Sequence, residues 1–298
     1  MPTGGASDEE LVVASAMARI LLIAVTVAAS QYGAVNFPTS CSPEVNATFQ
    51  TSMSMLYSFY YTPALDGFLN VTAAQPQCCI AYWGAAWTFT HPIWDFISDE
   101  RLARARAFSR DASDCVARAG ASVRERAYIE ALRAYVAEDA RLDAAPALRL
   151  ARWRDATRDL VYAPFGADDE NAGVLYGLAL LAVGYYSESE PAEDYPHLRA
   201  AGALEDAAIA RNPASPGALH FAIHSYDQPP LAAHALDAAK AYAHASVAVP
   251  HALHMPSHIF TDLGNWTDAV ASNVASTGLG YKLASGQIDN EARPDTTR

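Results

Sequence analysis

The sequence predicts an all-α fold, an α-solenoid of stacked antiparallel helix pairs. Past residue 40 the chain is rich in alanine and favours helix in one segment after another, whereas alternating runs of β-branched residues are almost absent. Short breaks at proline, glycine and aspartate clusters divide these segments. A stretch near the C-terminal end also repeats an earlier stretch at a spacing of 34 residues.

The composition excludes several classes of protein. Of the 298 residues, 51% are hydrophobic and 18% are charged, whereas a disordered chain would be more charged and less apolar. The 20 Lys and Arg against 33 Asp and Glu give a net charge of −13. Because nucleic acids and anionic membrane surfaces repel an acidic protein, we expect neither as the main partner.

Residues 1–30 resemble a targeting segment rather than part of the fold. The apolar run 20–29 is about ten residues long, which is too short to cross a bilayer, and small residues follow at 28–30 as at a signal-peptide cleavage site. The acidic stretch 8–10 does not suit a signal peptide, so we hypothesise that translation starts at Met17. We therefore expect a secreted or lumenal protein. The alternatives are a membrane anchor formed by residues 20–30 and a buried amphipathic helix.

Two further features fit an oxidising, extracellular or lumenal setting. Three Asn-x-Thr triplets are candidate glycosylation sites, at Asn46, Asn70 and Asn265. The four cysteines allow one or two disulfides, in which Cys41 pairs with Cys78, Cys79 or Cys115. Because adjacent cysteines rarely bridge each other, Cys78 and Cys79 should have different fates, but the spacing does not choose between the connectivities.

The helix boundaries from residue 31 to residue 284 are signalled by caps and breakers. Three helix starts combine a polar cap with a proline or an early acid: Ser42-Pro43-Glu44, Ser122 before the run 124–138, and Ser215-Pro216. Stops are expected at Pro76, at Pro164-Phe165-Gly166, at Asp227-Gln228-Pro229-Pro230 and at Gly264. Residues 285–298 are polar and lack periodicity, so we expect a frayed tail there.

An internal repeat gives the most information about the architecture. Residues 216–224 (PGALHFAIH) align with residues 250–258 (PHALHMPSH) at an offset of 34, and the same offset carries Ala235 onto Ala269 in the following helix. Thirty-four residues is the tetratricopeptide period, and a helix-turn-helix unit of that size buries its apolar face only by stacking on its neighbours.

The chain accordingly resembles the tetratricopeptide family. Residues 45–78 carry the aromatic, small, aromatic and proline positions of its motif as Tyr61, Ala64, Phe68 and Pro76. Residues 250–280 match the turn and the second helix of the motif through Leu263-Gly264-Asn265-Trp266 and Ala269. Residues 100–210 match less well, and we expect only helices there.

A narrower resemblance rests on residues 79–84 (CIAYWG), 220–227 (HFAIHSYD) and 250–260 (PHALHMPSHIF). These segments are similar to a largely uncharacterised group of tetratricopeptide-like proteins, over roughly residues 35–280. Members of that group usually continue through further helical repeats. We therefore expect the last helix pair to lack a polar cap.

Histidines are concentrated in the repeated stretch, as His220-x3-His224 and His251-x2-His254-x3-His258. Residues four apart share one face of a helix, so each HxxxH pair offers two imidazoles to one ion. The two pairs lie one repeat apart, on first helices that should stack about 8–10 Å from each other. The four rings of His220, His224, His254 and His258 could then converge.

The sequence thus predicts a divalent-metal site on the concave wall of the solenoid, with Zn, Cu or Fe as the ion. Candidate further ligands or outer contacts are His91, His251, Asp227 and Asp262. If the site keeps an open position, metal-dependent chemistry on a small substrate follows. The alternative is a binding scaffold without catalysis, whose groove holds a peptide or protein and whose histidines are polar contacts. Pro256 disfavours helix between His254 and His258 and could kink that turn.

Overall fold

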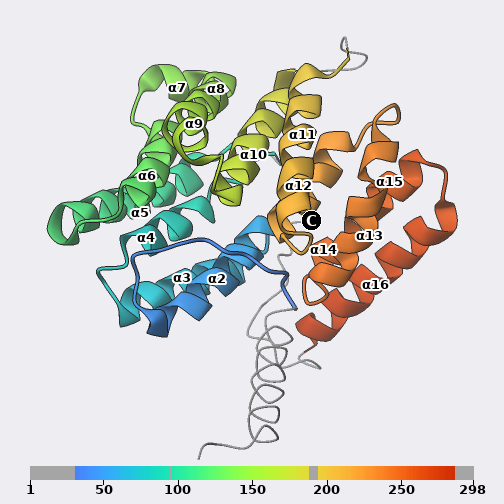
Figure 1. Cartoon of the computed structure of the whole chain (residues 1–298), viewed down its shortest axis with the longest axis horizontal. Helices are drawn as coiled ribbons and strands as arrows, with labels where there is room; N and C mark the ends of the chain where they lie inside the picture. The colour runs from blue at the N-terminus through green and yellow to red at the C-terminus, as the bar shows by residue number, and fades with distance from the viewer. Residues whose placement is uncertain (1–30, 94–95, 188–193, 286–298) are drawn as a thin grey trace, which may run out of the picture.

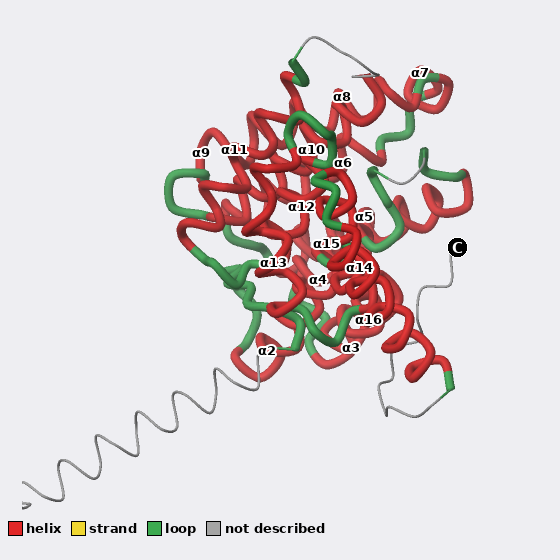
Figure 2. Tube along the Cα trace, turned by 90° about the vertical axis from the view of Figure 1, so that its right-hand side faces the viewer, coloured by secondary structure: helices red, strands yellow, loops and turns green. Residues whose placement is uncertain are grey.

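The computed structural model of the chain describes residues 31–93, 96–187 and 194–285. Within these residues the fold is all-helical, and the predicted fold class is confirmed (Figure 2). The predicted targeting segment, residues 1–30, lies outside the described residues, as does the tail from residue 286. No helix in the described ranges combines the length and the apolar character that a membrane span needs.

The helices pack as successive hairpins (Figure 1). The pairs are α2 (Pro43–Tyr57) with α3 (Tyr61–Ala74), α4 (Cys79–Trp87) with α5 (Asp99–Ala119), α6 (Val123–Val136) with α8 (Pro146–Ala156), α10 (Glu170–Ser187) with α11 (Pro196–Arg211), α12 (Pro216–Tyr226) with α13 (Leu236–Ala245), and α14 (Pro250–His254) and α15 (Pro256–Asp262) with α16 (Trp266–Ala284). Shorter helical segments lie in the connections: α7 (Ala140–Ala144), the π-helix η1 (Thr157–Tyr162), α9 (Ala163–Phe165) and the 3-10 helix η2 (Ala232–Ala235).

The spacing of the hairpins explains which repeats the sequence revealed. First helices begin at residues 43, 79, 123, 170, 216 and 250, so successive units differ in length, and only the step from 216 to 250 equals 34 residues. The units that start at 79, 123 and 170 are longer by ten residues or more. In the second of these, α7, η1 and α9 account for the extra length. These longer units fall in the region where the repeat pattern was weak.

Two of the three predicted polar caps form, whereas Ser42 occupies the N-cap position of α2 without a capping hydrogen bond from its side chain. Ser122 accepts a hydrogen bond from the backbone N–H of Glu125, and the Glu125 carboxylate accepts one from the N–H of Ser122, which completes a capping box at α6. Ser215 caps α12, with Pro216 in the first turn. At the other end, the α15 turn closes through Gly264, which has a φ of 72° that suits glycine.

An extended segment, residues 31–42, crosses the hairpins from the side of α12 and α14 toward α4 (Figure 1). We call it the N-terminal strap. It meets the junctions before α14, α12, α10 and α6 in turn, through four backbone carbonyls of the strap. The contacts are Ala248 N–H to Gln31 O (3.0 Å), Asn212 Nδ2 to Ala34 O (2.8 Å), Asn171 Nδ2 to Asn36 O (2.8 Å) and Arg124 Nη1 to Pro38 O (2.8 Å). One segment therefore fixes the relative position of successive hairpins.

The far end of the strap is held by a buried carboxylate and a disulfide. Glu125 accepts hydrogen bonds from both the backbone N–H and the hydroxyl of Ser40, at 2.8 and 2.7 Å. Burial alone would raise the pKa of Glu125, but these bonds and those from Ser122 outweigh it and keep that pKa below its usual value. The next residue, Cys41, is bonded to Cys78 just before α4.

All four cysteines are paired, as Cys41–Cys78 and Cys79–Cys115. As expected, the adjacent Cys78 and Cys79 do not bridge each other; each has its own partner. The first bridge ties the strap to α4, and the second ties α4 to α5. The start of α4 is thus cross-linked on both sides.

The predicted glycosylation acceptors differ in accessibility. Asn70 and Asn265 are exposed, whereas Asn46 is half-buried and accepts a hydrogen bond from Gln50 Nε2 at 3.1 Å. Asn265 also caps α16 through the backbone N–H of Asp268. Glycosylation at all three positions stays a prediction.

Helix α16 carries an apolar face that is exposed among the described residues. Four large apolar side chains on it are well exposed: Trp266, Val270, Val274 and Tyr281. They follow one another at spacings of four, four and seven residues and so share one face of the helix. The expected lack of a polar cap stays a prediction.

A carboxyl group is buried between α10 and α11. Glu205 is fully buried, and neither oxygen of its carboxyl has a hydrogen-bond partner among the described residues. It packs against Gly177, where an added side chain would collide with the carboxyl oxygen. Burial, with a smaller contribution from the charge of Asp206, raises the pKa of Glu205 well above its usual value. Burial therefore favours the neutral, protonated carboxyl.

We predict that the free energy of unfolding of the wild type falls as pH rises, and that Glu205→Gln abolishes the part of this fall that is due to Glu205. The unfolded chain releases this proton near pH 4.5 and the folded chain holds it to much higher pH, so folding becomes less favourable above pH 4.5. This group alone contributes about 1.4 kcal/mol per pH unit in that window. Urea unfolding at pH 5, 6, 7 and 8 should show that the free energy of unfolding of the variant increases relative to that of the wild type at each step. Glu130→Gln, at an exposed position, should follow the wild type. Parallel wild-type and Glu205→Gln profiles would contradict the prediction.

We also predict that the two disulfides have separable effects. Cys41→Ala with Cys78→Ala should lower the free energy of unfolding by about 2–4 kcal/mol and release the strap. Hydrogen exchange at the Ala34 and Ala248 amides, which bond across the strap, should then accelerate.

Cys79→Ala with Cys115→Ala is the matched control, because its loop spans 36 residues against 37. It should cost a similar free energy without exposing those two amides. Equal acceleration of amide exchange in both variants would show that the strap does not depend on its own disulfide.

Candidate metal centre

Helix α12 holds the first two histidines in the interior. It packs against α2, α10, α11 and α13, and every residue from Pro216 to Tyr226 is buried. Gly217 lets α12 lie close to α2 and α10, because a side chain at this position would press on Tyr57 of α2 and Val174 of α10. His220 and His224, one turn apart on this helix, are 0% and 2% exposed.

The end of α2 fixes the protonation of His220. The ring Nδ1 lies 2.7 Å from the backbone carbonyl oxygen of Tyr57, which can only accept, so Nδ1 carries the proton and donates it. The other ring nitrogen, Nε2, therefore presents a lone pair. It lies 3.1 Å from His224 Nε2 and 3.0 Å from His251 Nε2.

Three imidazoles thus converge on one point. One nitrogen from each of His220, His224 and His251 lies within 4.8 Å of the other two. Nitrogens bonded at about 2.0–2.1 Å to a tetrahedral zinc ion are about 3.3 Å apart. The distances from His220 Nε2 to the other two rings, 3.1 and 3.0 Å, are close to this value, and His224 and His251 lie within 4.8 Å of each other. A single lone pair on His220 cannot satisfy two N–H donors well, whereas an ion between the rings would accept a lone pair from each. The residues present therefore fit a metal ion with three imidazole ligands.

The electrostatics of the three rings suit metal binding. Burial lowers the pKa of His220 to about 3, and burial, together with the neighbouring rings, lowers the pKa values of His224 and His251 well below the usual range. The rings are neutral at pH 7, which is the state that binds metal ions.

The structure does not bring the four predicted histidines together at one point. We expected His220, His224, His254 and His258 to converge, but the third ring beside His220 and His224 is His251, which the sequence gave only as an additional candidate. His254 and His258 form a neighbouring pair, with 3.1 Å between their Nε2 atoms. The residue that faces His220 lies 31 positions further on rather than 34. The adjacent first helices are therefore offset by about one turn at the point where they meet.

Pro256 does not separate the second pair. α14 ends at His254 and α15 begins at Pro256, but Met255 between them keeps helical backbone angles of −52° and −39°. The chain continues in the same direction across the break, so His254 and His258 still project from one side.

His91 does not reach the cluster. Its ring stacks on Tyr61 at 3.9 Å between centroids, Tyr61 stacks on Phe59 at 5.5 Å, and Phe59 contacts the His220 ring at 4.5 Å. Two aromatic rings therefore lie between His91 and the nearest imidazole. His91 Nε2 lies instead 3.1 Å from the carbonyl oxygen of Thr88.

Sequence reasoning missed the contribution of α2. Phe59 lies within 6.0 Å of the ring centroids of all three converging histidines, and Tyr57 supplies the carbonyl that orients one of them. Phe59 belongs to an aromatic run, residues 57–61 (YSFYY), which is a usable signal for an aromatic wall. A backbone carbonyl leaves no signal in the sequence.

Of the two predicted acidic residues, Asp227 makes the direct contact. Its Oδ2 lies 3.0 Å from His258 Nδ1, and this bond is the main reason that the pKa of His258 is raised. Asp262 acts on the same ring only through its charge. Burial and the charge of Asp227 raise the pKa of Asp262 above its usual value.

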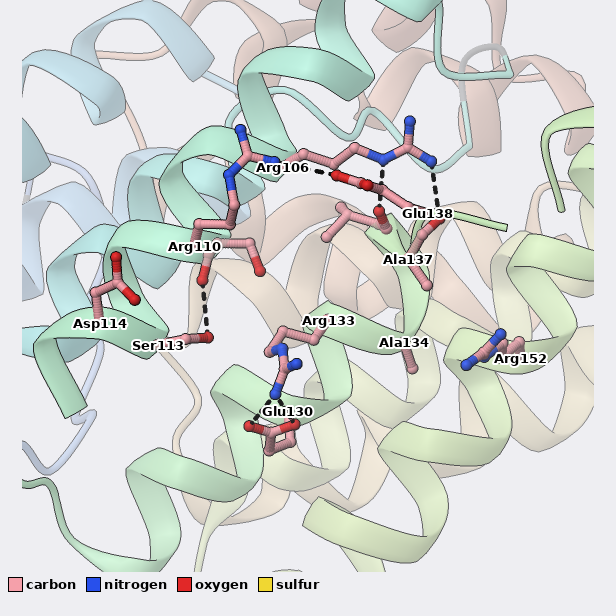
Figure 3. Close-up of a pocket in the computed structure, with 12 residues that line it drawn as sticks. Arg106, Arg110, Ser113, Asp114, Glu130, Arg133, Ala134, Ala137, Glu138 and Arg152 are labelled. Atoms are coloured by element: carbon pink, nitrogen blue, oxygen red, sulfur yellow. Dashed lines mark hydrogen bonds and ion pairs between the residues drawn. The ribbon is translucent and has the colours of Figure 1, made fainter. Parts of the chain in front are cut away.

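A hollow lined by α5, α6 and α8 is rich in arginine but does not suit an anion. Arg110 is bonded to Glu138 at 3.2 Å and Arg133 to Glu130 at 2.7 Å (Figure 3). Arg106 is bonded to Asp143 at 3.0 Å and also donates to the carbonyl of Val136 at 2.8 Å. These three arginines are therefore already paired within the fold.

No family model, no curated protein and no solved structure matches the chain. The tetratricopeptide resemblance therefore stays a prediction that rests on the sequence motifs.

Proposed function

We propose that the protein is a metalloprotein that binds one transition-metal ion through His220, His224 and His251. The convergence of their three ring nitrogens within 4.8 Å carries this proposal. His220 and His224 are buried and His251 is half-buried, the lowered pKa values keep the rings neutral, and the proton position of His220 is fixed by Tyr57. Neutral imidazole favours Zn, Cu, Fe or Ni over the harder Mg and Ca.

Three protein nitrogens leave a coordination position open on a tetrahedral ion. Sites of this composition bind a water molecule there and lower its pKa toward neutrality, which supports hydrolytic chemistry on a small substrate. The aromatic side of the centre, formed by Phe59 and Tyr61, excludes water from the adjoining wall. An enzymatic role on a small molecule is therefore part of the proposal.

We further propose that the protein works outside the reducing cytosol. Both disulfides support this location, because such bridges persist in secreted or lumenal proteins. The arrangement also removes thiols as competing metal ligands, since no cysteine is free. The histidines are then the residues left to bind a soft or borderline ion.

The proposal predicts that the full chain, stripped with a chelator and dialysed, takes up at least one equivalent of Zn²⁺ or Cu²⁺. Elemental analysis gives the stoichiometry, and the melting temperature should rise with the concentration of the ion, because only the folded chain forms the site. His220→Ala with His251→Ala should bind one equivalent fewer than the wild type.

His234→Ala with His244→Ala is the matched control, because both rings are exposed and neither belongs to the cluster. This variant should bind as many ions as the wild type. If the wild type binds none of Zn²⁺, Cu²⁺, Fe²⁺ or Ni²⁺, the histidines are polar contacts and the proposal is wrong.

A further inference from the structure

The pair His254 and His258 remains outside the three-histidine site. Their Nε2 atoms are 3.1 Å apart, the same separation as between His220 and His224 one repeat earlier. Each pair sits one turn apart on a first helix, at positions related by the 34-residue repeat. The outer pair is half-buried, whereas His220 and His224 are buried.

Hydrogen bonds fix the proton of His254 on the outward-facing nitrogen. Its Nδ1 lies 2.7 Å from Asn273 Oδ1. The amide of Asn273 cannot be turned around, because its Nδ2 donates to the carbonyl of Ala269 at 2.9 Å. Asn273 Oδ1 can only accept, so Nδ1 of His254 is the donor and Nε2 has the lone pair.

The same reasoning applies to His258. Its Nδ1 lies 3.0 Å from the carboxylate Oδ2 of Asp227, which accepts the proton. In their neutral forms the two rings therefore point lone pairs at each other across 3.1 Å. Such a contact is repulsive unless a metal ion or a proton lies between the nitrogens, and the bond to Asp227, which raises the pKa of His258, makes a proton the competing occupant. A carboxylate that accepts from the remote nitrogen of an imidazole is the usual outer partner of a metal-bound histidine.

We propose that His254 and His258 bind a second metal ion beside the first, so that the five histidines form a two-metal centre. The two groups are adjacent: ring centroids are 6.1 Å apart for His251 and His254, and 6.3 Å apart for His224 and His258. Asp227 orients the ring of His258, and with Asp262 nearby it supplies negative charge that offsets a second cation. Two protein nitrogens leave room for water or a bridging substrate atom.

This inference rests on the proposed function, because the second ion is placed relative to the first. Paired ions stabilise the attacking and the leaving oxygen of a displacement reaction. A two-metal centre of this kind would suit hydrolysis of a phosphate ester or an amide, whereas a structural metal site has a closed coordination shell.

The test is the number of Zn²⁺ ions bound by the full chain, measured by elemental analysis and by titration calorimetry. The wild type should bind two, and His254→Ala with His258→Ala should bind one. His220→Ala with His251→Ala should also bind one, and His234→Ala with His244→Ala should bind two. Circular dichroism of each variant confirms that it folds.

A conservative change tests the second ion without removing a ligand. Asp227→Asn should leave two sites but weaken the second by about 10–100-fold, the usual effect of losing such an outer partner. Affinity for the first ion should not change.

The outcomes separate the two proposals. One ion in the wild type that persists in His254→Ala with His258→Ala overturns the second site and leaves the first. No ion in the wild type overturns both. The nitrogen chemical shifts of the His258 ring in saturating Zn²⁺ give a third readout. If they show an imidazolium, a proton occupies the gap between the outer nitrogens, and the second site alone is overturned.

Discussion

The contact between α2 and α12 is the constraint on which the centre depends. In a simple stack each hairpin touches only its neighbours, and the first hairpin would not meet the fifth. Here the Tyr57 carbonyl binds His220, its hydroxyl donates to Asn171 Oδ1 at 3.1 Å, and its ring lies across Phe221 at 6.0 Å. The N-terminal strap extends the same closure to the junctions before α14, α10 and α6. The strap and α2 therefore hold the early and late hairpins together (Figure 1), and the contact between His220 and Tyr57 lies at this junction.

This closure also explains the electrostatics of the site. A concave wall open to water would leave imidazoles with ordinary pKa values, whereas α2 covers α12 and removes His220 and His224 from solvent. The rings are then neutral at pH 7, and a buried neutral imidazole needs a partner for its lone pair. The outer pair is half-buried and borders Asp227 and Asp262. Negative charge in an acidic protein thus lies at the more accessible end of the cluster, where an incoming cation would arrive.

The sequence predicted much of this fold because the helix signals are local. Caps such as Ser122 and Ser215 act within one turn, and the 34-residue copy marks two equivalent helices, so helix starts and the histidine-rich stretch could be read directly. The choice of His251 over His254 could not be predicted, because it depends on how far one helix slides along the next. The contribution of Tyr57 acts through a backbone carbonyl, which every residue has. Inserted segments such as α7 and η1 hid the repeats between residues 100 and 210, since they change the unit length without removing the hairpins.

The arrangement of protons sets a limit on what can fill the cluster. Three of the five rings, His220, His254 and His258, donate through Nδ1 to fixed acceptors and so present bare Nε2 atoms. In neutral rings only His224 and His251 could supply an N–H, and both of their Nε2 atoms lie against His220. Between His254 and His258 only protonation of His258, whose pKa is raised, would supply a proton. In the inner group His220 offers one lone pair to two neighbouring Nε2 atoms. Metal ions at both positions would satisfy the two groups together, because every Nε2 would then face a cation while each Nδ1 bond stays in place.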